Sequence, residues 1–125
     1  MKQTAIFEEV QIIIKKAREE IVSDSYYCVF YDKGMYFTRV IEISGQKTRT
    51  KFLKTRSFAD NSYEWPGKDD IAINVDTAFI IAGALELKGN GSFTIAEFDK
   101  IKELYHNASV NKDKLFPMAE DEGND

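Results

Sequence analysis

The chain has 125 residues, of which 43% are hydrophobic and 13% are aromatic, and its formal net charge is −4. This length suits one folded domain, and the apolar content excludes a disordered chain. The single cysteine, Cys28, excludes an internal disulfide and suits a reducing compartment.

The apolar stretch near the N-terminus is interrupted by the charged residues Glu8, Glu9, Lys15 and Lys16. It therefore has the composition of neither a secretory signal nor a membrane span. We expect a cytoplasmic protein that has no membrane partner.

The first half of the chain predicts one helix and then strands. Apolar residues recur at helical spacing over residues 4–22, which indicates an amphipathic helix. Two strands rich in aromatic and β-branched residues follow, at 26–31 and 35–43, and the turn Asp32-Lys33-Gly34 joins them.

The middle of the chain predicts two more strands and a second helix. The third strand, over 47–58, is rich in threonine and basic residues, and a polar loop over 60–70 follows it. The fourth strand is predicted at 71–75. Asp76 is a suitable N-cap for a helix over 77–87.

A last helix is predicted over 94–106, which completes the order α-β-β-β-β-α-α. This order indicates an α+β fold: a four-stranded antiparallel meander with an N-terminal helix and two C-terminal helices. We expect one domain over residues 1–110 and a flexible acidic tail over 111–125. The four acids of 120–125 account for the whole net charge.

Few residues suit catalysis. The only histidine, His106, falls near the end of a predicted helix, where a cation complements the helix dipole, and Cys28 falls inside an aromatic strand. The segment 86–98 resembles a calcium loop, but Lys88 occupies its third ligand position, so we expect a plain helix–turn–helix connection there. We expect no enzyme, no cofactor and no metal.

The basic third strand is the sharpest feature of the sequence. Residues 43–59 contain five cations and no acid, namely Lys47, Arg49, Lys51, Lys54 and Arg56. Lys47, Arg49 and Lys51 are two residues apart and share one face of a strand. Lys54 and Arg56 are an odd number of residues away from them and would lie on the other face. A straight strand would therefore split them, whereas a bulge near Phe52 and Leu53 would bring all five to one side.

Aromatic residues accompany these cations. Cations interleaved with aromatic rings on a sheet face suit single-stranded nucleic acid, since cations track phosphates and each exposed ring stacks on a base with about 1–3 kcal/mol. The alternative is a solvated sheet face lined with Lys, Arg and Thr for solubility, with most rings in the core. The nearby residues are Arg39, Tyr26, Tyr27, Tyr31, Tyr36, Phe58, Tyr63 and Trp65.

Residues 36–85 resemble a known family in the order of their parts. A strand (YFTRVIEI), a glycine turn (SGQ), a basic strand (KTRTKFLKTRSF), a polar loop, a short strand (DIAINV) and a capped helix (DTAFIIAGAL) follow one another. This order is similar to the transcriptional positive-coactivator and Whirly superfamily of single-stranded-DNA-binding proteins. The closest local match is WPGKDDIAINVDTAF.

The resemblance implies four antiparallel strands before a helix, pairing of two copies, and a curved sheet that grips single-stranded DNA or RNA. It implies phosphate contacts from Arg39, Lys47, Arg49, Lys51, Lys54 and Arg56, and stacking rings from Tyr36, Phe52, Phe58 and Trp65. This sequence departs from the family pattern by its additional N-terminal and C-terminal helices.

The competing class is a small protein-binding module. An acidic α+β protein without catalytic groups suits an inhibitor or adaptor that acts on a larger host protein or complex, of the kind that phages encode. The basic strand would then meet an acidic surface of the partner, with Tyr, Trp and Arg as hot spots. A carboxylate enzyme is a third class, but the sequence places no acid pair on one surface.

Overall fold

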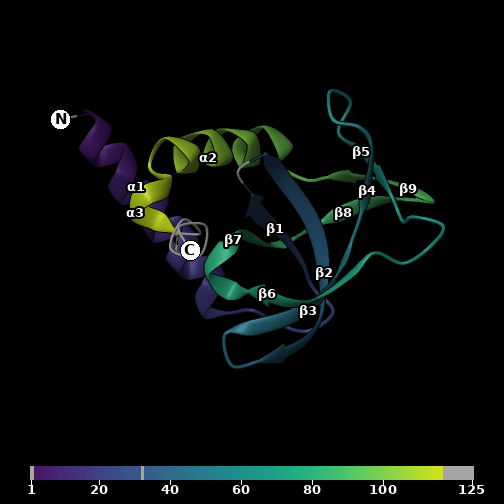
Figure 1. Ribbon diagram of the computed structural model, residues 1–125. Helices are drawn as coiled ribbons and strands as arrows, with labels where there is room; N and C mark the ends of the chain where they lie inside the picture. Colours follow the sequence, from purple (N-terminus) through teal and green to yellow (C-terminus); the bar gives the residue numbers. More distant parts are fainter. Residues whose placement is uncertain (1, 32, 117–125) are drawn as a thin grey trace.

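The computed structural model describes residues 2–31 and 33–116, with side chains from Phe7 onward (Figure 1). The chain begins with helix α1 and then forms nine strands, a short 3₁₀ turn and two further helices within the described residues. The elements are α1 (Lys2–Glu19), β1 (Tyr26–Tyr31), β2 (Gly34–Ser44), β3 (Lys47–Phe52), β4 (Lys54–Ser57), β5 (Ser62–Glu64), β6 (Ile71–Asp76), η1 (Thr77–Phe79), β7 (Ile80–Leu85), β8 (Leu87–Asn90), β9 (Ser92–Ile95), α2 (Phe98–Val110) and α3 (Lys112–Leu115).

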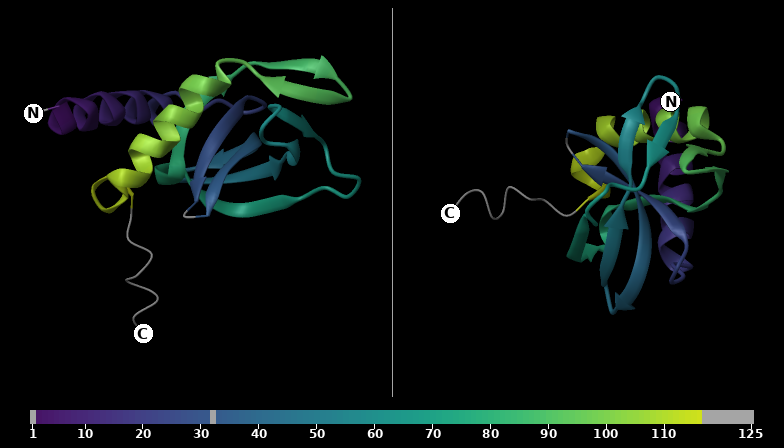
Figure 2. Two further views of the ribbon diagram at one scale, coloured as in Figure 1. Left: turned by 90° about the horizontal axis from the view of Figure 1, so that it is seen from above. Right: turned by 90° about the vertical axis from the view of Figure 1, so that its right-hand side faces the viewer.

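The α+β class, an N-terminal helix and the presence of two C-terminal helices are confirmed, although these two helices are α2 and α3 and not a helix over 77–87, and the single four-stranded meander is wrong. The strands form two antiparallel sheets, one in the order β6-β3-β2-β1-β7 and one in the order β4-β5-β9-β8. The helices gather at one end of the molecule and the second sheet lies at the other (Figures 1 and 2). The predicted α1 is confirmed, although it ends at Glu19 rather than residue 22.

The predicted third strand divides at Leu53 and continues in the other sheet. β3 pairs with β2 and β6, whereas β4 pairs with β5. Leu53 is only 5% exposed and its amide donates to the carbonyl of Phe37 at 2.9 Å, so its side chain turns into the core between the sheets. The chain therefore passes from one sheet to the other at this buried residue. The predicted polar loop over 60–70 likewise contains β5, in which Tyr63 is 1% exposed.

The predicted helix over 77–87 is wrong. Asp76 caps a turn as expected, since its carboxylate accepts from the amide of Ala78 at 2.8 Å, but only the 3₁₀ turn η1 follows. The chain then becomes β7, which pairs antiparallel with β1. Pairing buries Ile80 and Ile81 completely, and this tertiary burial of two β-branched side chains outweighs the local helical preference.

The last helix is also displaced along the chain. Residues 92–95, predicted in part as helix, form β9, and α2 runs over Phe98–Val110 instead of 94–106. The segment 86–98, expected to connect two helices, contains the β8–β9 hairpin. Beyond α2 the chain forms α3, and Phe116 is buried against Phe30 with ring centroids 4.2 Å apart. Residues 117–125 of the predicted acidic tail lie outside the described residues.

Two apolar clusters occupy the opposite faces of the five-stranded sheet. The larger lies among this sheet, the second sheet, α1 and α2, and it includes Phe37, Tyr63 and Phe98. The smaller lies on the other face, where the sheet meets the C-terminal part of α1. We name this second side the inner face; its buried residues are Tyr27, Val29, Thr38, Val40, Thr48, Thr50, Val75 and Ile80.

None of the helices that the structure describes is long and apolar enough to cross a membrane.

Candidate nucleic-acid interface

The strand register divides the predicted site residues between the two faces of the five-stranded sheet. Tyr26 lies opposite Arg39, which lies opposite Lys51, so these three side chains share one face. Thr38 lies opposite Phe52, and these two belong to the inner face. Successive side chains of a strand alternate between faces, so the cations of β3 and the ring of Phe52 point to opposite sides.

Three of the four cations of the first face pair with carboxylates. We name this surface the cationic face; it consists of Arg39, Lys47, Arg49 and Lys51. Within it, Arg39 pairs with Asp24 at 2.8 Å, Lys47 pairs with Asp76 at 3.3 Å, and Lys51 pairs with Asp69 at 3.3 Å. Arg49 has no ion pair among the described residues.

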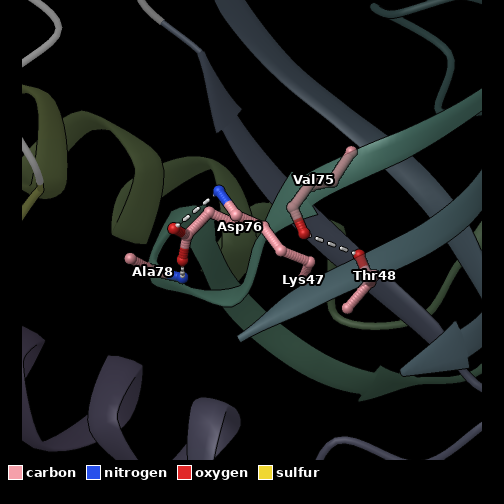
Figure 3. A network of polar contacts seen from close by, with 5 residues as sticks. All are labelled: Lys47, Thr48, Val75, Asp76 and Ala78. Carbon is pink, nitrogen blue, oxygen red and sulfur yellow. Dashed lines mark hydrogen bonds and ion pairs between the residues drawn. The ribbon is translucent and has the colours of Figure 1, made fainter. Parts of the chain in front are cut away.

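The β3–β6 end of this face is held together tightly. Figure 3 shows Lys47 and Thr48 of β3 beside Val75 and Asp76 of β6. Asp76 accepts from the amide of Ala78 and from the ammonium of Lys47, while the hydroxyl of Thr48 donates to the carbonyl of Val75 at 3.0 Å. Lys47 is thus a partner in a structural network, with less freedom to meet a phosphate.

Trp65 lies beside the cationic face. The ammonium of Lys51 lies 5.4 Å from the centroid of the Trp65 ring, and the ring of Tyr26 lies 6.3 Å from it. A cation within about 6 Å of an aromatic face is attracted to it. The Trp65 ring is therefore already in contact with Lys51 and with Tyr26.

The remaining predicted residues of β4 lie in the second sheet. Lys54 and Arg56 both approach Glu64 of β5, at 4.0 and 3.5 Å. Phe58, 47% exposed, packs against Phe98 with ring centroids 5.2 Å apart, and it lies near Lys102 of α2. The break at Leu53 therefore distributes the five basic residues over two sheets.

An aromatic cleft opens at the edge of the inner face. We name it the aromatic cleft, because three rings line it: Tyr31, Tyr36 and Phe52. Tyr31 and Tyr36 meet edge to face with centroids 5.3 Å apart, and each lies 6.4 Å from Phe52. The cleft has a volume of about 850 Å³, and the two tyrosines are 38% and 41% exposed. This volume lies within the range of small-molecule sites, about 300–1,000 Å³.

Lysines surround the aromatic cleft. Lys33 of the β1–β2 turn, Lys54 of β4 and Lys68 of the loop before β6 line it, together with the carboxylate of Asp70. Lys33 and Lys68 have no ion pair among the described residues, and both are exposed. The rim therefore offers cations that are less committed to carboxylates than those of the cationic face.

Backbone contacts hold the cleft in shape. The amide of Phe52 donates to the carbonyl of Asp70 at 2.9 Å, which fixes the loop before β6 against β3. The hydroxyl of Tyr105 on α2 donates to the carbonyl of Tyr31 at 3.1 Å. Burial, with smaller effects from Tyr36 and Asp70, raises the pKa of Tyr31. Like any tyrosine at neutral pH, it carries a protonated phenol that can donate a hydrogen bond.

The sequence interpretation therefore located part of the cleft. It included Tyr36, Phe52 and Lys54, which the structure brings together, along with Phe58 and Trp65, which lie elsewhere. It did not include Tyr31, Lys33 and Lys68 among the site residues. The sequence feature that could have indicated Lys33 as a site residue is its position in a tight turn between two aromatic strands.

The thiol of Cys28 and the side chain of Tyr63 are buried in the core. Burial raises the pKa of the Cys28 thiol, which therefore stays protonated and is a poor nucleophile. Burial, and to a lesser degree Cys28, also raises the pKa of the neighbouring Tyr63 phenol. In the described part of the chain, no three His, Cys, Asp or Glu side chains gather in a way that could hold a metal ion.

Comparison of the chain with protein-family models, with curated proteins and with solved structures gave no significant match. The resemblance to the positive-coactivator and Whirly superfamily, and the pairing of two copies that it implies, stay predictions.

Proposed function

We propose that this protein binds single-stranded nucleic acid without catalysing a reaction, and that the aromatic cleft receives the bases. The observation that carries the proposal is the meeting of three aromatic rings with three lysines at one open cleft. Aromatic rings supply stacking that any base accepts, and lysines supply the charge that a phosphate backbone needs.

Some of the cations have carboxylate partners and others have none within the described part of the chain. This difference favours the aromatic cleft, rather than the cationic face, as the main contact with nucleic acid. Arg39, Lys47 and Lys51 each have a carboxylate partner within 3.3 Å, so a phosphate would have to displace Asp24, Asp76 or Asp69. Lys33 and Lys68, which have no such partner among the described residues, can meet a phosphate directly. The cationic face then contributes chiefly through Arg49 and through long-range attraction.

The first test reverses the charge of the cleft rim. We expect the double variant Lys33→Glu, Lys68→Glu to lose at least about tenfold in affinity for a labelled ~20-nucleotide single strand at low salt. Fluorescence anisotropy at several salt concentrations measures this change. Each phosphate contact contributes about −0.7 to the slope of log K against log[salt], so losing two contacts should make the slope shallower by about 1.4.

The matched control carries the same change of charge on α1. Lys15 and Lys16 are exposed there and line no part of the cleft, so Lys15→Glu, Lys16→Glu should weaken binding much less than the rim variant. Equal losses in the two variants would show that only net charge matters. Absence of any binding at low salt by the unmodified protein would contradict the proposed function.

The second candidate function is binding of another protein along the edge strand β6. β6 ends the order of the five-stranded sheet, and its Ile71 and Ile73 are 40% and 66% exposed. An edge strand can accept an extended segment from a partner through backbone hydrogen bonds, and side-chain pockets then give specificity.

Nuclease treatment separates the two functions. If the protein-binding function holds, a partner stays bound after nuclease digestion, and Ile73→Lys weakens its retention by about tenfold or more, as expected for a hot-spot residue. Quantitative pull-down with and without nuclease measures this retention. Loss of every partner on nuclease treatment would leave nucleic acid as the ligand.

A further inference from the structure

Two buried threonines, Thr38 and Thr50, neighbour the rings of the aromatic cleft in the strand register. On β2, Thr38 lies two residues after Tyr36 on the inner face, and on β3, Thr50 lies two residues before Phe52 on the same face. Both threonines are 0% exposed. Thr38 and Thr50 are therefore the next inner-face residues along β2 and β3 from the rings that line the cleft.

Neither hydroxyl has a hydrogen-bond partner among the described residues. A buried polar group without a partner destabilises a protein, and such groups are rare in native structures. Thr48, one step further along β3, shows the usual arrangement, because its hydroxyl donates to the carbonyl of Val75. The polar atoms of Thr38 and Thr50 thus have unused hydrogen-bonding capacity beside a candidate binding site.

Phe52 belongs both to the lining of the cleft and to the immediate neighbourhood of Thr38. It lies directly opposite Thr38 in the β2–β3 register, it is half-buried, and its ring lines the cleft. A different χ1 rotamer would move the ring of Phe52 away from Thr38, the residue that it faces in the register. Half-buried aromatic side chains at the mouth of a site can change rotamer without a change of backbone.

We propose that the hydroxyls of Thr38 and Thr50 read the polar edge of an unpaired nucleobase that enters the aromatic cleft past Phe52. This inference rests on the proposed function and adds to it that binding is base-selective. A hydroxyl donates one hydrogen bond and accepts up to two, so a pair of them can match carbonyl and amino groups on a base edge. Stacking on Tyr36 would then supply affinity, and the threonines would supply selection.

The test compares four labelled single strands, ~10-mers of dA, dC, dT and U, with the full chain and with Thr38→Val, Thr50→Val. Valine has nearly the same shape as threonine but no hydroxyl. We expect the unmodified protein to prefer one base by roughly five- to tenfold, the factor that one or two neutral hydrogen bonds supply. The double variant should lose this preference while its melting temperature is unchanged or higher.

The matched control is Thr48→Val, which removes a hydroxyl that has a partner. It should lower the melting temperature and leave the base preference intact. In the unmodified protein, NMR spectra of the threonine methyl groups give a second readout. Titration with the preferred mononucleotide should shift the signals of Thr38 and Thr50 and leave that of Thr48 nearly unchanged.

The outcomes separate the inference from the proposed function. Equal binding of all four strands, or a preference that the double variant retains, would overturn the role of the threonines and leave the cleft as a sequence-neutral site. Methyl signals of Thr38 and Thr50 that do not move on titration would do the same. Absence of binding to every strand would overturn both.

Discussion

Replacing Gly83 by alanine should destabilise the protein by about 3 kcal/mol or more, because steric overlap and backbone strain add at this position. Gly83 of β7 has φ of +150°, which L side chains rarely adopt, and a Cβ there would lie 2.1 Å from Cδ1 of Tyr27. Tyr27 is fully buried, and its hydroxyl accepts from the amide of Val22 at 2.8 Å, so the ring cannot move aside freely. Urea denaturation followed by circular dichroism measures the loss.

Gly67→Ala is the matched control for this prediction. Gly67 lies in the exposed loop before β6, and a Cβ there would meet no atom within 4 Å. The free energy of unfolding should change by less than about 0.5 kcal/mol, because the substitution touches no packed atom. Similar losses for the two variants would mean that the close approach of β7 to Tyr27 is not what requires glycine at residue 83.

Tyr36→Ala should weaken binding of single-stranded nucleic acid by about 1–3 kcal/mol, the range measured for stacking of one base on one ring, or roughly five- to 150-fold in affinity. Tyr36 is 41% exposed and meets Tyr31 and Phe52 edge to face, so its removal opens one wall of the aromatic cleft. The ring adds little to the main core, and the variant should keep its fold. Anisotropy titration at one fixed salt concentration measures the loss of affinity.

Phe58→Ala is the control for the stacking prediction. Phe58 has similar exposure, 47%, but its ring packs on Phe98 at the second sheet and lies outside the aromatic cleft. The affinity of the Phe58→Ala variant for single-stranded nucleic acid should match that of the unmodified protein. A larger loss from Phe58→Ala than from Tyr36→Ala would place the interface on the second sheet and contradict the cleft as the base-binding site.

The helix α1 and the first two strands could be predicted from the sequence because local pattern decides them. Residues 26–31 form one strand, as predicted, since a run of aromatic and β-branched residues has few alternatives. Residues 77–87 could not be predicted in this way. A good N-cap at Asp76 favours a helix locally, but pairing with β1 buries Ile80 and Ile81, and long-range pairing leaves no mark on the local pattern.

The sequence by itself determined which residue types are available for binding: a run of cations without acids, with aromatic rings close by. Only the tertiary structure decided which of them meet. At the buried Leu53 the basic strand passes from one sheet to the other, and carboxylates from distant segments, such as Asp24 and Asp69, pair with Arg39 and Lys51. The face of the sheet on which a side chain lies depends on the strand register, and its ion-pair partner depends on long-range contacts. The local sequence pattern contains neither.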